Sequence, residues 1–270
     1  MRYQVLVLDL DGTLTNSKKE ITEPTRKALA EIQQAGKIVV LASGRPINGV
    51  VPLARELELK KYGGYMLSFN GARITRCATG ELIYNRTVPG EVIRPIFEYV
   101  RKLEGVNIIS YSDTEIFSAK EPGRYTLLES RINDMNVVVA DDFPSALPPS
   151  VNKLLLPGEP DVLEALIPKL KKQYHGLLSI YRSEPFFLEI MPQNIDKATS
   201  LQKLLNSLGM TADEMICCGD GYNDVSMIEY AGLGVAMGNA QTAVKASADF
   251  VTRTNDEDGI LHVINLFMRD

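Results

Sequence analysis

The 270-residue sequence contains only two histidines and three cysteines, and both small numbers argue against whole classes of function. His175 and His262 lie far apart in the chain and neither has a second histidine at ligand spacing, which argues against a histidine-based zinc site and against a serine–histidine hydrolase. Cys77, Cys217 and Cys218 show no metal or redox spacing, a usage typical of a reducing cytosol. We therefore expect a cytoplasmic protein.

Long apolar runs and an excess of positive charge are also missing. No stretch reaches the roughly 18 apolar residues of a transmembrane helix, and residues 1–10 have a strand pattern that contains an aspartate, unlike a signal peptide. The formal net charge is −5, which gives no basic surface for nucleic acid or for an anionic membrane. We expect neither as a partner, and the sequence leaves the oligomeric state open.

Short apolar runs that alternate with amphipathic segments are the main pattern present. They are typical of parallel strands in a sheet that helices cover on both faces. In the first such unit Thr22 is a suitable N-cap and Gly36 a suitable end for the intervening helix. A second unit contains a helix expected at Asp224–Ala231. The clearest strand candidates are Val5–Leu8, Ile38–Ala42, Tyr65–Phe69, Met215–Cys218 and Gly234–Met237.

The pattern changes in the middle of the chain. The segments GVNIISYSD and FFLEIMP alternate as antiparallel strands do, and the proline-rich stretch Asp141–Asp161 predicts a long connection. We interpret residues 82–187 as an α+β domain inserted into an α/β core that residues 1–81 and 188–270 form. The alternative is one continuous large domain, which the length also allows.

Two carboxylates stand at the end of the first apolar run. Asp9 and Asp11 are two residues apart, so an extended backbone points both side chains the same way. Two like charges at such a short separation cost several kcal/mol unless a cation neutralises them. Oxygen ligands without histidine or thiolate favour Mg²⁺. The sequence therefore predicts a magnesium site, whose ligand candidates are Asp9, Asp11, Asp220 and Asp224.

Hydrogen-bond donors for a phosphoryl group follow other strands of the predicted sheet. Ser43 and the amide of Gly44 come after the second apolar run, and Lys197 begins a helix that leads into a later strand. Ligands of open α/β sheets bind at the carboxyl ends of the strands, where such donors suit phosphoryl oxygens. The phosphate-binding candidates are Ser43, Gly44, Lys197 and Asn223.

Four segments, DLDGTLTNS, SGR, DKATSL and GDGYND, resemble in this order the four motifs of the haloacid-dehalogenase-like phosphohydrolases. The sequence is most similar to the Cof-type branch, in which a large cap is inserted between the second and third motifs, and the segment SFNGA (68–72) resembles that branch as well. The resemblance implies a Rossmann-like parallel-sheet core with an inserted α+β cap. One difference is that Asn194 and Ala198 stand near the motif lysine, where the branch usually has glycines.

The resemblance also implies roles for the acidic residues. Asp9 is the expected nucleophile, which forms an aspartyl phosphate, and Asp11 the expected general acid and base. Mg²⁺ would be held by the carboxylate of Asp9, the main-chain carbonyl of Asp11 and Asp220, with Asp224 in support. Asn223 would steady its loop, while Ser43 and Lys197 would hold the phosphoryl oxygens.

The expected substrate is a small phosphate ester, most simply a sugar phosphate, since the inserted domain is large enough to exclude a macromolecule. One alternative is a sugar phosphomutase built on the same core. A second, from another class, is a receiver-type signalling module, against which stand Asp11 and the size of the insertion. The substrate-contact candidates are Arg45, Asn70, Arg124, Tyr125 and Asn194.

Overall fold

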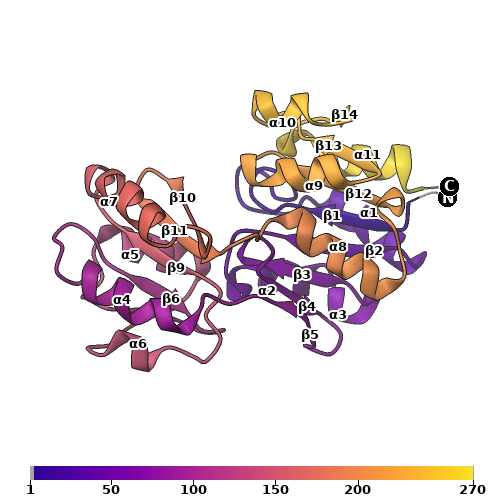
Figure 1. The fold of residues 1–270 in the computed structure, drawn as a ribbon. Coiled ribbons are helices and arrows are strands. Elements are labelled where there is room, and N and C mark those ends of the chain that lie inside the picture. Colours follow the sequence, from indigo (N-terminus) through magenta and orange to yellow (C-terminus); the bar gives the residue numbers. More distant parts are fainter. Residues whose placement is uncertain (1–2, 270) are drawn as a thin grey trace. The chain divides into compact units, whose positions relative to one another are not determined.

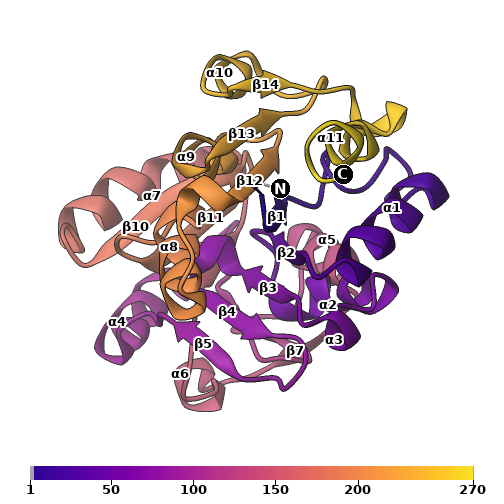
Figure 2. The same cartoon turned by 90° about the vertical axis from the view of Figure 1, so that its right-hand side faces the viewer.

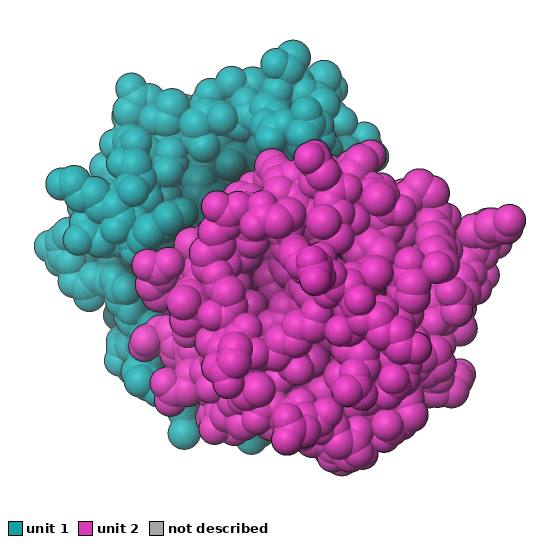
Figure 3. All heavy atoms as spheres, turned by 90° about the vertical axis from the view of Figure 1, so that its left-hand side faces the viewer, with its two compact units in different colours: residues 1–44, 50–84, 196–270 teal, residues 45–49, 85–195 magenta. Residues whose placement is uncertain are grey.

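The structure is a computed structural model that describes residues 3–269, and these residues form two compact units. Unit 1 contains the described residues of 1–44, 50–84 and 196–270, and unit 2 contains residues 45–49 and 85–195; Figure 3 shows the two in different colours. Among the described residues, no helix has the length and apolar character needed to cross a membrane.

Unit 1 is built on an eight-stranded sheet with the strand order β14-β13-β12-β1-β2-β3-β4-β5. The strands from β14 to β3 pair in parallel, and β4 pairs antiparallel with β3. All five predicted apolar runs form strands of this sheet, as Figure 1 shows. The strand bounds are β1 Val5–Leu8, β2 Ile38–Ala42, β3 Tyr65–Ser68, β4 Arg73–Arg76, β5 Leu82–Asn85, β12 Met215–Gly219, β13 Leu233–Ala236 and β14 Phe250–Val251.

Helices cover both faces of this sheet, which confirms the predicted α/β class. Figure 2 shows α8 and α9 on one face and α1 and α11 on the other. Thr22 caps α1 as predicted, since its side chain accepts a hydrogen bond from the amide of Thr25. The expected helix at Asp224–Ala231 is shorter and follows a 3₁₀ turn, Tyr222–Asp224. The helices are α1 Glu23–Gln34, α2 Ile47–Glu56, α3 Leu59–Tyr62, α8 Lys197–Leu208, α9 Val225–Tyr230, α10 Thr242–Ala246 and α11 Gly259–Phe267.

The core of unit 1 fixes the strand ends in place. Val5 and Val40 on neighbouring strands pack with Leu201 and Leu204 of α8 in one buried cluster. Each fully buried aliphatic side chain of this kind contributes about 1.5–3 kcal/mol to folding. This packing holds α8, and therefore its first residue Lys197, against the sheet.

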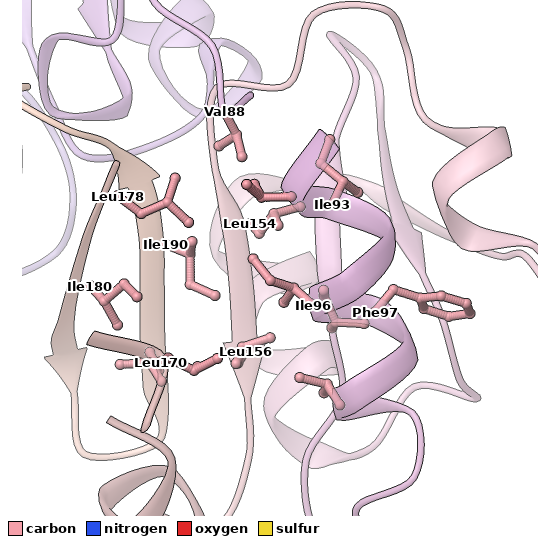
Figure 4. Packing of buried hydrophobic residues seen from close by; sticks show 14 of the residues in the cluster. Val88, Ile93, Ile96, Phe97, Leu154, Leu156, Leu170, Leu178, Ile180 and Ile190 are labelled. Carbon is pink, nitrogen blue, oxygen red and sulfur yellow. The ribbon is translucent and has the colours of Figure 1, made fainter. Parts of the chain in front are cut away.

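Unit 2 is an α+β unit with a six-stranded sheet of order β10-β11-β9-β6-β7-β8. In Figure 4, Leu154 and Leu156 of β9 lie between Ile190 of β11 and Ile96 of α4, in the apolar core. The strands are β6 Ile109–Tyr111, β7 Glu115–Ser118, β8 Asn136–Val139, β9 Leu154–Pro157, β10 Leu178–Glu184 and β11 Phe187–Pro192. The helices are α4 Gly90–Val100, α5 Arg124–Asn133, α6 Phe143–Ala146 and α7 Pro160–Gln173.

The stretch Asp141–Asp161 differs from the prediction of a long connection, which was wrong. It contains α6 and also β9, an interior strand that pairs antiparallel with both β11 and β6. The strand has only four residues, its last is Pro157, and all four are buried, so it shows neither the length nor the alternation by which a half-buried strand is recognised.

Two unit boundaries lie at 84/85 and 195/196, where the sequence suggested 81/82 and 187/188, and residues 45–49, expected in the core, belong to unit 2. The shift at the second boundary has a direct cause, since β11 (Phe187–Pro192) pairs with β9 and β10 inside unit 2. At the first, β5 (Leu82–Asn85) is the last strand of the unit 1 sheet. Strand pairing therefore moves both of these boundaries towards the C-terminus, although Asn85, the last residue of β5, falls in unit 2.

Candidate active site

Three predicted site residues of unit 1, Asp9, Asp220 and Lys197, lie at the carboxyl edge of its sheet. Asp9 directly follows β1 and Asp220 directly follows β12, and these two strands are parallel neighbours. Lys197 is the first residue of α8, whose N-cap Asp196 accepts a hydrogen bond of 2.8 Å from the amide of Thr199. The α8 cap and the two strand ends thus bring together side chains that are nearly 200 residues apart in sequence.

Lys197 is fully buried and its ammonium group makes three hydrogen bonds. Its Nζ donates to Asp9 Oδ1 at 2.7 Å, to Asp224 Oδ1 at 2.6 Å and to the carbonyl oxygen of Ala42 at 2.8 Å. Burial by itself would lower the pKa of Lys197, but the carboxylates of Asp224 and Asp9 raise it above its ordinary value. The ammonium group accordingly stays charged and ties two acidic residues together.

The Asp9 carboxyl group lies in surroundings that disfavour its charge. Burial and the nearby Asp224 carboxylate raise the pKa of Asp9 to about 8, although Lys197 opposes the shift. Carboxylate oxygens of Asp9, Asp220 and Asp224 lie within 4.8 Å of one another. One lysine cannot neutralise three ionised carboxyl groups, so a further positive charge would be favourable here.

Asp220 is positioned by the loop that follows β1. Thr13 Oγ1 donates to Asp220 Oδ1 at 2.8 Å. Gly12 has a φ of +83°, and a Cβ atom built there would lie 2.5 Å from Asp220 Oδ2, so only glycine fits this position. Burial raises the pKa of Asp220 above its ordinary value.

Asp224 is buried and both of its carboxylate oxygens have partners. Oδ1 accepts from Lys197, and Oδ2 accepts from the backbone amides of Asp220 and Gly221, each at 2.9 Å. A Cβ atom at Gly219 would lie 2.4 Å from the Asp224 Cβ, so the chain passes closely over this side chain. Asp224 therefore fixes the shape of the loop that presents Asp220.

The phosphate-binding candidates other than Lys197 lie in the loops after β2 and β12. Ser43 is buried, and its amide donates to the carbonyl oxygen of Leu67 at 2.9 Å. Asn223 Nδ2 donates to Asn70 Oδ1 at 3.1 Å. The backbone of Gly44 lies against the same Asn70 amide. The structure thus brings Asn70, predicted as a substrate contact, between the two loops.

Asp11 is more exposed than Asp9 and its side chain has a different partner. Lys19 Nζ donates to Asp11 Oδ1 at 2.7 Å. The sequence interpretation did not include Lys19, and its signal was weak because the lysine lies in a turn eight residues further on. That turn is closed by Asn16, whose side chain accepts from the amides of Lys18 and Glu20.

The remaining substrate-contact candidates belong to unit 2. Arg124 and Tyr125 start α5; the Arg124 guanidinium pairs with Glu159 at 2.6 Å and lies over the Tyr125 ring, which stacks on Phe186 with 4.8 Å between centroids. Both line a pocket of about 230 Å³ within this unit. Arg45 Nη1 donates to the carbonyl oxygen of Gly49 at 3.3 Å, and Asn194 is exposed with a φ of 60°. Substrate contact by these residues stays a prediction.

Comparisons with known proteins identify the family of this chain. Residues 6–264 match the family model of the haloacid dehalogenase-like hydrolases. A solved structure of a haloacid dehalogenase-like hydrolase from Bacteroides thetaiotaomicron superposes with a TM-score of 0.94 at 45% identity and covers 98% of this chain and 99% of its own. The structure of the HAD subclass IIB sugar phosphatase BT4131 has a TM-score of 0.80 at 25% identity, with 98% of each chain covered.

A curated relative from Bacillus subtilis, the 5-amino-6-(5-phospho-D-ribitylamino)uracil phosphatase YcsE, is 29% identical over 97% of this chain and 94% of its own. The chain belongs to the haloacid dehalogenase-like hydrolases. Within this superfamily it is a phosphatase of the Cof-type branch, with a Rossmann-like α/β core.

Proposed function

We propose that this phosphatase is a Mg²⁺-dependent phosphomonoester hydrolase that acts through an aspartyl phosphate on Asp9. The observation that carries the proposal is the group of Asp9, Asp220 and Asp224 beside the buried Lys197 ammonium. A nucleophilic carboxylate, a cationic partner and an acidic cluster are the parts that phosphoryl transfer through a covalent intermediate needs.

The residues present fit a magnesium ion. All donors in the cluster are oxygens, and burial raises the pKa of Asp9 to about 8, a cost that a bound cation would remove. Asp9, Asp220 and the main-chain carbonyl of Asp11 would hold the ion. Because both oxygens of Asp224 already accept hydrogen bonds, we assign Asp224 to holding the loop. Bound Mg²⁺ would neutralise charge on the phosphoryl oxygens.

In the first half-reaction a carboxylate oxygen of Asp9 forms a bond to phosphorus while the bond from phosphorus to the ester oxygen breaks. The departing alkoxide takes a proton from the Asp11 carboxyl group. Lys197 holds the Asp9 carboxylate in one orientation through its 2.7 Å hydrogen bond. A contact from Lys197 to the phosphoryl group would require one of its three present hydrogen bonds to open.

In the second half-reaction a water molecule gives a proton to the Asp11 carboxylate and its oxygen attacks phosphorus. The bond between phosphorus and Asp9 breaks, inorganic phosphate leaves, and both aspartates return to their starting states. Splitting the displacement in this way replaces one difficult step by two easier ones.

The proposed substrate class is a small sugar or polyol phosphate, and unit 2 is proposed to set the preference as a cap. Two comparisons support this choice: BT4131 is named a sugar phosphatase, and the name of YcsE describes a phosphate on a ribityl chain. The same core could instead return the phosphoryl group to a sugar hydroxyl, as a phosphomutase does. Release of inorganic phosphate from a hexose phosphate, against formation of an isomeric hexose phosphate in the presence of a bisphosphate, separates the two.

The covalent step is tested by acid quenching during turnover of a ³²P-labelled hexose phosphate with Mg²⁺. Wild-type protein and the control variant Asp141→Asn, which changes an exposed aspartate of unit 2, should retain protein-bound label. Asp9→Asn should retain none and release no phosphate. Labelled Asp9→Asn protein, or near-normal turnover by it, would overturn the proposal.

A further inference from the structure

The turn between β3 and β4 has an unusual backbone. Phe69, Asn70 and Gly71 have φ angles of 53°, 53° and 102°, so three successive residues lie in the left-handed region. For a bulky residue such as phenylalanine this conformation is a genuine outlier, and each non-glycine residue held there costs on the order of 1–2 kcal/mol. A buried turn keeps such strain only where its surroundings hold it.

Backbone contacts anchor the turn on two sides. The amide of Asn70 donates to the carbonyl oxygen of Ser43 at 2.9 Å, next to Gly44 in the loop after β2. Ser200 Oγ, one turn into α8, donates to the carbonyl oxygen of Gly71 at 2.6 Å. A Cβ atom at Gly71 would lie 2.7 Å from the carbonyl oxygen of Asp196, the residue before Lys197. The strained turn thus touches both the second-motif loop and the start of the lysine helix.

The side chain of Asn70 reaches a third segment. Its Oδ1 accepts the hydrogen bond from Asn223 in the loop after β12, and a Cβ atom at Gly44 would lie 3.1 and 3.2 Å from the two terminal atoms of the amide. Asparagine is one of the few residues that tolerate a left-handed backbone, so this residue type meets both requirements: the backbone angle and the bridging amide.

We infer that Asn70 is a positioning residue that holds the loop of Ser43 and Gly44 against the loop of Asn223. The inference rests on the proposed function, because it assumes that the Ser43 loop binds the phosphoryl group. Productive phosphoryl transfer requires that donors and nucleophile stay within about 0.5 Å of their working positions. Asn70 contacts loops that follow two different strands. The strained backbone of its turn places the side-chain amide between these loops.

Three variants separate this role from a simple effect on folding. Asn70→Gly removes the amide but relieves the backbone strain, Asn70→Ala removes the amide and keeps the strain, and Asn223→Ala removes the donor. We expect Asn70→Gly to melt at or above the temperature of Asn70→Ala, while both lose about 10- to 100-fold in kcat/KM. The loss should be equal for an aryl phosphate and a hexose phosphate, and the Ki of inorganic phosphate should rise.

A double-mutant cycle tests whether Asn70 acts through Asn223 or affects activity independently of it. If Asn70 works through Asn223, the variant with both Asn70→Gly and Asn223→Ala should lose much less activity than the product of the single losses. Losses that multiply, or Asn70→Gly activity within twofold of wild type, would overturn the inference. Failure of wild-type protein to release phosphate from either ester would instead contradict the proposed function, so the two failures are distinguishable.

Discussion

At the scale of single residues, the main feature of the site is the balance between one buried lysine and the carboxyl groups around it. Lys197 compensates Asp9 and Asp224 through charge-assisted hydrogen bonds of 2.7 and 2.6 Å. Asp220 adds a further carboxyl group to the same place. Removing a compensating charge from such a cluster is costly because an uncompensated ion stays buried, so the metal-free protein already contains the imbalance that a cation would correct.

This imbalance predicts a pH dependence of stability in the metal-free protein. The pKa of Asp9 is raised to about 8 in the folded state, from 3.8, by burial and by Asp224. The folded state therefore binds the Asp9 proton more tightly than the unfolded state does, and this stabilisation is complete below pH 3.8 and is lost as the pH rises towards 8. With a chelator present, the free energy of unfolding should fall over this range by up to about 1.4 kcal/mol per pH unit from this group.

Asp9→Asn provides the comparison, since it has no proton to lose. Both proteins should be unfolded with urea in chelator at pH 5, 6, 7 and 8. The free energy of unfolding of the variant should rise relative to that of the wild type as the pH increases. A constant difference between the two across this range would contradict the cause assigned here.

At the scale of elements, two short loops carry most of the geometry. The turn after β1 needs a left-handed residue with no side chain at Gly12, because Asp220 occupies the space where a Cβ would lie. The loop after β12 is folded around the Asp224 carboxylate, which accepts two backbone amides. The hydrogen bond of 2.8 Å from Thr13 Oγ1 to Asp220 Oδ1 joins the two loops.

Gly12→Ala should therefore weaken the proposed metal site in addition to straining the backbone. A matched control is Gly36→Ala, since Gly36 has nearly the same φ, +85°, but no atom within 4 Å of its Cβ position. Both variants should lose about 1 kcal/mol of stability from the left-handed angle. Only Gly12→Ala should also bind Mg²⁺ at least tenfold more weakly, measured by calorimetric titration. Equal Mg²⁺ affinity in both variants would show that Asp220 is not part of the site.

At the scale of the whole molecule, the acidic cluster belongs to one of the two units. Unit 1 contains the complete acidic cluster with its lysine, and unit 2 contributes none of those residues. We therefore expect the rate of phosphate release to depend on which metal ion is supplied. We expect the preference among phosphate esters to change with substitutions in unit 2.

Metal exchange tests the expected dependence of phosphate release on the metal ion. Chelation should abolish phosphate release from an aryl phosphate, and Mg²⁺ should restore it. Ca²⁺ should compete with Mg²⁺ and inhibit, because the larger ion accepts more oxygen ligands at longer distances and can bind both oxygens of the nucleophile. Full activity in chelator would rule out the proposed magnesium dependence.

Arg45 tests the proposed ester preference of unit 2, with Arg101 as a control. Arg45→Ala should lower kcat/KM for a hexose phosphate about tenfold and leave that for an aryl phosphate unchanged, as expected for a contact with the sugar. Arg101 is an exposed residue of unit 2 paired with Glu98, so Arg101→Ala should change either value by less than twofold. An equal loss on both substrates in Arg45→Ala would place that residue with the phosphoryl group instead.

Much of the fold and of the site could be predicted from local sequence. The strands Val5–Leu8 and Ile38–Ala42 were predicted with their observed bounds because both are short, apolar on both faces and followed by polar residues. Strand β9 was missed because its four buried residues lie within a proline-rich stretch. Its identity as a strand depends on β6 and β11, the neighbours with which it pairs.

The sequence by itself determined which residue types stand at the carboxyl ends of the strands, because hydrophobic periodicity is local and parallel strands bring their carboxyl ends to one edge. Only the tertiary structure decided what each side chain touches there. Lys197 donates to Asp9 across 188 positions of sequence, and Asn70 accepts from Asn223 across 153. Such contacts are set by the close packing of loops from distant parts of the chain, which no local pattern encodes.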